Sequence, residues 1–212
     1  MNNRLLSELD YSEIIDHYNH RVEISHCLKS LLAASQIQDY VDLALGIADP
    51  YGNYSAAEHG LGPRILNERP YETIFKLATK LSIVQSAREM RNDIYKSNVP
   101  YLKVGVGTEM AMLLQPDRHW VANTRSIWSH LVMRHRSIAT ANKALRLYRE
   151  GSDESKMAYD MWCAAHEDME LDFTNLAAGG AEQAHAQGIQ PGSITYLWAD
   201  AVANALYERH GG

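Results

Sequence analysis

A dense group of cationic and imidazole side chains lies between residues 118 and 149 and could bind an anion. This basic stretch holds seven Lys and Arg residues, three His residues and no Asp or Glu, in a chain whose formal net charge is −6. Six of the seven cations are Arg, whose planar guanidinium binds phosphate and carboxylate through two parallel hydrogen bonds. We therefore expect a discrete pocket for a small anion. The charged and imidazole residues are Arg118, His119, Arg125, His130, Arg134, His135, Arg136, Lys143, Arg146 and Arg149.

On a helix, the side chains in the middle of the basic stretch would fall on two faces. Arg125 and Ser129 are four residues apart, and so are His130 and Arg134, so each pair would share a face. With the amide of Asn123, such a helix offers one ligand an amide, a hydroxyl and two guanidinium groups. The alternative is a solvated basic face that packs against acidic helices, such as the His-Glu-Asp-Met-Glu segment at residues 166–170.

The same segment resembles a known motif. Residues 120–134 read W-V-A-N-T-R-S-I-W-S-H-L-V-M-R, which is similar to the C-terminal nucleotide and flavin motif of the flavin-dependent thymidylate synthase family, with its N-x-R-S-L core and a later Arg. The matching positions are Asn123, Arg125, Ser126, Ile127 and Arg134. Three weaker similarities precede it in family order, at residues 55–59, 64–68 and 109–116. The chain departs from the family at Met112, where the family has Arg, and lacks the family's R-H-R triplet near residue 64.

The resemblance implies a diverged enzyme of the same class, a flavin-dependent transferase. The implied reaction is a reductive one-carbon transfer to C5 of deoxyuridylate or a related reaction, in which cationic donors stabilise charge that develops on the pyrimidine. It implies a bound flavin, FAD or FMN, and a homotetramer. Arg134 would be the catalytic cation and would also bind the nucleotide, together with Arg136 and Glu109. The flavin would lie against Asn123, Arg125, Ser129, Glu58 and His59.

A second interpretation is a metal enzyme. The chain contains two E-x-x-H pairs, Glu23 with His26 and Glu182 with His185. Di-iron and di-manganese four-helix bundles use this spacing. A complete site would need one further Glu from each of two other helices, and the lone-Glu helix expected well before the first pair is missing. We therefore assign no metal ligands and keep a di-iron or di-manganese centre as an alternative.

A third interpretation needs no catalysis. In it the chain is a helical interaction protein whose basic helix docks an acidic partner. It predicts that Arg125 and Arg134 are exposed rather than gathered in a pocket, and that the protein binds neither flavin nor nucleotide.

Composition limits the other functional classes. The chain has 212 residues, 46% of them hydrophobic, which is enough for a full core, and we expect one domain over residues 1–212. The acidic total argues against a protein that coats nucleic acid or anionic membrane. The two cysteines, Cys27 and Cys163, have neither disulfide-framework nor zinc spacing. Because no apolar leader or spanning run is visible, we expect a cytoplasmic protein, and a homo-oligomer if the resemblance holds.

Hydrophobic periodicity predicts mainly helices. We expect helical segments within residues 4–48, closed by turn chemistry at residues 49–53, and then a loop at residues 55–71 rich in Gly and Pro. A long helix is expected at residues 71–96 and an extended segment at residues 99–107, with Thr108 capping a helix that ends before Pro116. Further helices are expected at residues 120–149, with a break near residues 135–137, then from Ser152 to the pair Gly179-Gly180, and at residues 193–210. The predicted fold class is thus mainly α, with a small sheet as an α+β alternative, in one compact domain of long helices.

Overall fold

The computed structural model describes residues 3–149 and 156–211, and in these ranges the chain is helical and has no strand. The mainly α prediction is confirmed. The chain divides into two compact units. The terminal unit comprises Met1–Asn19 and Thr124–Gly212, and the central unit comprises His20–Asn123. Helix α2, Tyr11–Ala33, contributes residues 11–19 to the first and the rest to the second. That the two units form one domain stays a prediction.

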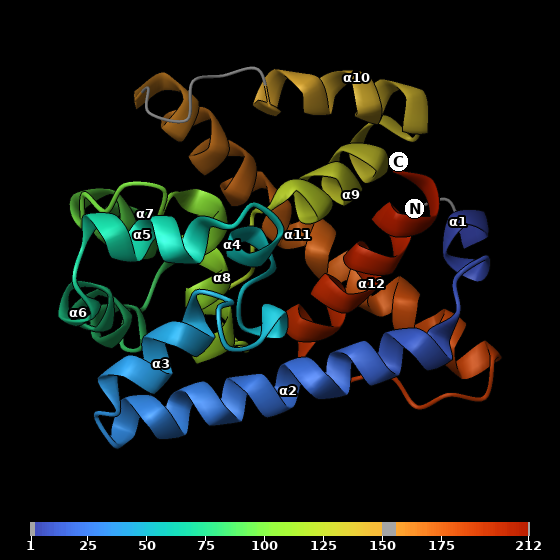
Figure 1. Ribbon diagram of the computed structural model, residues 1–212. Coiled ribbons are helices and arrows are strands. Elements are labelled where there is room, and N and C mark those ends of the chain that lie inside the picture. Colours follow the sequence, from blue (N-terminus) through green and yellow to red (C-terminus); the bar gives the residue numbers. More distant parts are fainter. Residues whose placement is uncertain (1–2, 150–155, 212) are drawn as a thin grey trace. The chain divides into compact units, whose positions relative to one another are not determined.

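The terminal unit is built around three mutually packed helices, α9, α11 and α12 (Figure 1). Their large side chains fill its core: Trp128 and Trp198 are almost fully buried, and the ring of Tyr18 meets that of Trp198 edge-on at 5.8 Å. A buried Trp needs an acceptor for its indole N–H. The indole of Trp128 donates to Asn142 Oδ1, and that of Trp198 donates to the Ala177 carbonyl. The helices of the unit, besides the start of α2, are α1 (Asn3–Ser7), α9 (Thr124–His135), α10 (Ile138–Arg149), α11 (Lys156–Ala186) and α12 (Thr195–His210).

The break expected near residues 135–137 is confirmed as the junction between α9 and α10. Arg136 adopts a positive φ of 53°, and its N–H donates to the Val132 carbonyl at 2.8 Å. A residue in this left-handed conformation just past a helix end satisfies the last carbonyls and turns the chain. The strong apolar periodicity of α10 then buries Ala141 and Leu145 and leaves the opposite face in solvent.

The central unit surrounds α8, whose residues Val106 to Leu114 are all buried. Gly107 allows a close approach of α7, because a Cβ at this position would lie 2.7 Å from Ile94 Cδ1. The remaining helices of this unit, besides the end of α2, are α3 (Ile37–Ala44), η1 (Pro50–Gly52), α4 (Tyr54–Glu58), α5 (Leu61–Glu68), α6 (Tyr71–Leu81), α7 (Ala87–Lys96) and α8 (Val104–Leu114).

The extended segment expected at residues 99–107 is wrong, because α8 already begins at Val104. Thr108 therefore does not cap a helix; it lies inside one, where its hydroxyl donates to the Val104 carbonyl at 2.6 Å. The cause of the error is burial. A short apolar run that is buried on every side lacks the alternation that separates strand from helix.

Two further predictions in the central unit are wrong. The loop expected at residues 55–71 contains α4 and α5, because the side chain of Asn53 caps α4 by accepting from the Ala56 N–H. Gly60, at φ 58°, makes the turn between these helices. The long helix expected at residues 71–96 is two helices, since Ser86 begins α7 by accepting from the Glu89 N–H.

The pair Gly179-Gly180 does not end α11, which continues to Ala186. A Cβ on Gly180 would lie 2.8 Å from Val202 Cγ2 and 3.3 Å from Trp198 Nε1. This glycine therefore permits close packing of α11 against α12 and is not a stop signal. The predicted start of this helix at Ser152 lies outside the described residues.

The turn predicted at residues 49–53 is confirmed by η1, where Asp49 accepts from the Tyr51 N–H. The helix end before Pro116 and the last helix are confirmed by α8 and α12. Within residues 3–149 and 156–211, no helix is both long enough and apolar enough to cross a membrane.

Candidate functional site

The polar side chains of α9 divide between its two neighbours as the four-residue spacing predicts. Arg125 and Ser129 lie toward α12: a guanidinium nitrogen of Arg125 is 3.8 Å from Glu208 Oε1, and the Ser129 hydroxyl donates to the Ala203 carbonyl at 3.3 Å. The guanidinium of Arg125 also lies over the ring of Tyr207, 5.8 Å from its centroid. Arg125 thus has a carboxylate and an aromatic face as neighbours, and its side chain is only 19% exposed.

The other face of α9 meets the acidic segment of α11. His130 Nδ1 is 2.6 Å from Asp172 Oδ2, and Arg134 Nη1 is 3.0 Å from Asp168 Oδ2. The two pairs differ in burial, because His130 is buried whereas the side chains of Arg134 and Asp168 are 58% and 59% exposed. Of residues 166–170, Asp168 thus faces the basic stretch, and it does so within the terminal unit. The exposed pair adds little stability, because solvent screens it.

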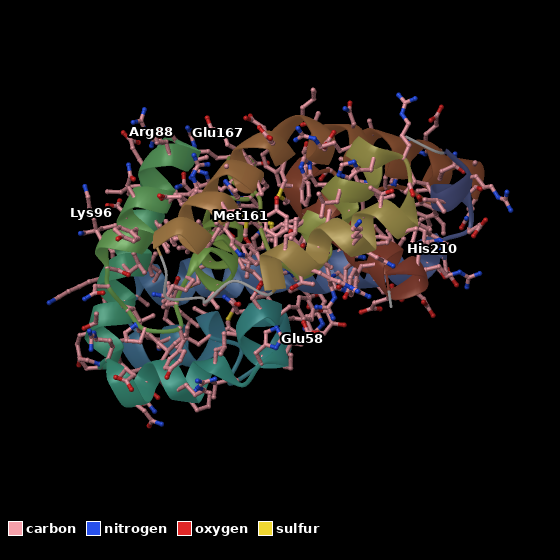
Figure 2. All side chains as sticks on the ribbon, turned by 90° about the horizontal axis from the view of Figure 1, so that it is seen from above. Glu58, Arg88, Lys96, Met161, Glu167 and His210 are labelled. Atoms are coloured by element: carbon pink, nitrogen blue, oxygen red, sulfur yellow. The ribbon has the colours of Figure 1, made fainter. Side chains whose placement is uncertain are left out.

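The remaining residues named for the flavin and nucleotide lie in the central unit, except for Arg136. Asn123 is the last residue of that unit and is buried. Glu58 and His59 are exposed at the end of α4, where Figure 2 labels Glu58. These placements do not test flavin or nucleotide binding, which stays a prediction.

Glu109, predicted to contact the nucleotide, is completely buried and serves as an internal anchor. Its carboxylate is 3.0 Å from Arg21 Nη2, whose side chain is also completely buried. The same carboxylate accepts from the N–H groups of Tyr54 and Ser55, at 2.9 and 3.1 Å, and from the Ser55 hydroxyl at 2.8 Å. Arg21 in turn donates to the Tyr51 carbonyl at 2.5 Å. The cluster therefore ties α2 and α8 to the start of α4.

The two E-x-x-H pairs are solvent-exposed: Glu23, His26, Glu182 and His185 all lie on outer helix faces. The first pair belongs to the central unit and the second to the terminal unit. In the part of the chain that the structure describes, no group of three or more His, Cys, Asp or Glu side chains is arranged to hold a metal ion.

A small hollow that the sequence did not indicate lies where α9 turns into α10. This junction pocket has a volume of about 170 Å³. Most of its walls are apolar, and Arg136 and Ser137 supply the polar atoms. Its lining residues are Leu5, Val132, Met133, Arg136, Ser137, Ile138 and Leu206. They come from four helices or their ends, so no local pattern reveals the pocket; its one sequence signal is the cation Arg136.

The exposed face of α10 begins at Ala139, the residue after Ile138 of this pocket. Residues Ala139, Lys143, Arg146 and Leu147 follow the spacing of one helix face, and all four are exposed. We call these four residues the α10 face. Leu147 is 64% exposed, which is high for a large apolar side chain. Within the described residues, neither Lys143 nor Arg146 takes part in an ion pair.

No protein-family model matches the chain, and neither a curated protein nor a solved structure shows significant similarity to it.

Proposed function

We propose that the terminal unit is a docking module that binds an acidic protein segment through the α10 face and the junction pocket. The observation that carries the proposal is the pair of exposed cations, Lys143 and Arg146, which take part in no ion pair among the described residues and lie on one helix face with the exposed Leu147. Arg is enriched in protein interfaces, and an exposed apolar side chain beside it adds contact area.

The junction pocket supplies the anchoring position that such an interface needs. Most binding energy in protein interfaces comes from a few side chains that fill well-packed pockets. A volume of about 170 Å³ is close to that of an engineered cavity of about 150 Å³ that binds benzene. The pocket therefore accommodates one aromatic or branched aliphatic side chain of the partner, with Arg136 at the wall to pair with a neighbouring carboxylate.

The spacing along α10 specifies the pattern of the partner. With a rise of about 1.5 Å per residue, Lys143 lies about 7.5 Å and Arg146 about 12 Å along the helix from Ile138, which lines the pocket. An extended segment advances about 3.3 Å per residue. Measured along the helix axis, acidic side chains about two and four positions from the apolar anchor would match these two separations.

The net charge of the chain indicates how such a partner would be recognised. A formal charge of −6 repels an acidic partner at long range, so the attraction must come from short-range contacts at the α10 face. Arg134 contributes less, because Asp168 already neutralises it. Binding should be modest in affinity and should weaken as salt increases.

The test uses a fluorescein-labelled, ten-residue peptide with one Phe and with Glu two and four positions after it, measured by fluorescence anisotropy. Binding should be saturable, and the double substitution K143E/R146E should weaken it about tenfold or more, which corresponds to about 1.4 kcal/mol. The matched control is R88E/K96E. It reverses two exposed cations at the ends of α7, labelled in Figure 2, and should leave binding unchanged.

Two peptides and one pair of small molecules separate the alternatives. Replacing Phe by Ser in the peptide should weaken binding, because the junction pocket is then unfilled, and replacing both Glu by Lys should abolish it. Equal binding of all three peptides would contradict the proposal. Incubation with FMN and deoxyuridylate, followed by removal of free ligand, tests the flavin interpretation; retained flavin absorbance at stoichiometric level would favour it over a docking module.

A further inference from the structure

The central unit carries an open groove between the end of α2, α6 and the end of α8, with a volume of about 510 Å³. This volume lies within the range of roughly 300–1,000 Å³ that is typical of small-molecule sites. Its floor is formed by the apolar side chains of Leu32, Phe75 and Leu114. The complete lining is Lys29, Leu32, Ala33, Ser35, Phe75, Thr79, Ser82 and Leu114. This groove and the proposed docking surface share no residue.

Lys29 is the only charged residue among those that line the groove. Two of the groove's hydroxyls cannot donate to a ligand without losing a bond, because Thr79 donates to the Phe75 carbonyl at 2.9 Å and Ser82 to the Thr79 carbonyl at 2.8 Å. The Lys29 ammonium and the Ser35 hydroxyl are therefore the side-chain donors available to a head group, and of the two only Lys29 is charged.

We propose that this groove binds a small amphipathic carboxylate, whose apolar part lies on Leu32, Phe75 and Leu114 and whose anionic head pairs with Lys29. The positive charge of Lys29 favours an anionic head group, and the apolar lining favours a hydrocarbon part. A site that offers one cation beside an apolar surface favours such a ligand over a neutral or cationic compound with the same chain.

The surroundings of Lys29 support an anionic head group. Burial lowers the pKa of Lys29, and the charge of Asp117 opposes that shift in part. A ligand carboxylate would compensate the desolvated ammonium more directly than Asp117 does. The two carboxylates would also repel each other, so Asp117 weakens the binding of an anion at Lys29.

The experiment titrates the full chain with decanoate, decanol and decyltrimethylammonium by isothermal titration calorimetry, at concentrations below those at which micelles form. Decanoate should bind most tightly. K29M should lower the affinity for decanoate about tenfold or more, because it removes one charge-assisted hydrogen bond. It should leave the affinity for decanol unchanged. D117N should raise the affinity for decanoate and leave the affinity for decanol unchanged.

Two further variants complete the test. K80M removes an exposed cation from α6 outside the groove lining and should bind all three compounds like the native chain. T79W, at an exposed position of the lining, should fill the groove and weaken all three. The proposal is overturned if decanoate binds no more tightly than decanol, if K29M binds decanoate like the native chain, or if T79W has no effect.

Discussion

Replacing Glu109 by Gln should strongly destabilise the central unit, because the carboxylate joins three helices from a completely buried position. Two donors reach each of its oxygens: Arg21 and the Tyr54 N–H reach Oε1, and the N–H and hydroxyl of Ser55 reach Oε2. Glutamine has one oxygen and one NH₂ group, so at least one N–H donor would face another donor even if the Ser55 hydroxyl turns to accept.

The expected loss follows from two contributions. A buried donor without a partner costs about 1–3 kcal/mol. In addition the Arg21 guanidinium, whose side chain has no exposed surface, would keep its charge without the counter-charge. Removing one partner of a buried ion pair costs about 3–5 kcal/mol, so we expect E109Q to lower the free energy of unfolding by about that amount.

The companion variant R21M should cost less than E109Q. It leaves a carboxylate that still accepts three hydrogen bonds from Tyr54 and Ser55. The double variant R21M/E109Q should be less destabilised than the sum of the single variants, with a coupling energy of about 1–3 kcal/mol. E23Q, at an exposed position of α2 two residues after Arg21, is the control and should change stability by less than about 0.5 kcal/mol.

The assay is urea unfolding followed by far-UV circular dichroism at 25 °C, with the free energy extrapolated to zero urea. A loss below about 1 kcal/mol in E109Q would contradict this expectation, because removing one charge of a buried ion pair costs more than that. A coupling energy near zero would refute the direct interaction of Arg21 with Glu109.

Further predictions concern pH and packing. Burial lowers the pKa of His119 below its ordinary value of 6.5, with a smaller opposing effect from its hydrogen bond to the Val84 carbonyl, so the unfolded chain binds more protons just below pH 6.5. Stability should therefore fall as pH drops through 6.5, and His119 should contribute at most about 1.4 kcal/mol per pH unit to that fall. In urea unfolding, H119Q should lose less stability than the native chain between pH 7.5 and 5.5. An unchanged pH dependence in H119Q would contradict this. G107A should destabilise by about 1–3 kcal/mol, because the new Cβ would lie 2.7 Å from Ile94, whereas G105A, whose Cβ would meet nothing closer than 3.6 Å, should be neutral or stabilise by up to about 1 kcal/mol. Thermal unfolding would test this pair, and equal melting temperatures for G105A and G107A would count against the packing described for α8.

The sequence predicted the turns and helix ends that capping and turn residues determine locally. The turn at residues 49–53 and the junction at residues 135–137 were correct, because capping and turn residues act over a few positions. The extended segment at residues 99–107 and the stop at Gly179-Gly180 were wrong for a common reason. Helices distant in the sequence bury α8 on all sides and place Val202 against Gly180. A local sequence pattern carries no information about such contacts.

The candidate sites show the same division. Helical spacing predicted which side chains of α9 share a face, and Arg125 and Arg134 do lie toward different neighbours. The ion pair between Arg21 and Glu109 was missed, because a buried pair between α2 and α8 leaves no signal in spacing or composition. The junction pocket and the Lys29 groove were missed because their linings come from several helices.

The most direct test of the docking proposal is a charge exchange between protein and peptide, measured by fluorescence anisotropy. The native chain should bind the Phe peptide that carries two Glu, and K143E/R146E should bind it about tenfold or more weakly. K143E/R146E should instead bind the peptide in which both Glu are replaced by Lys, because the reversed charges are again complementary. Binding should therefore recover in the exchanged pair. If K143E/R146E binds the Glu peptide as well as the native chain does, or if the exchanged pair does not bind, the α10 face is not the docking surface.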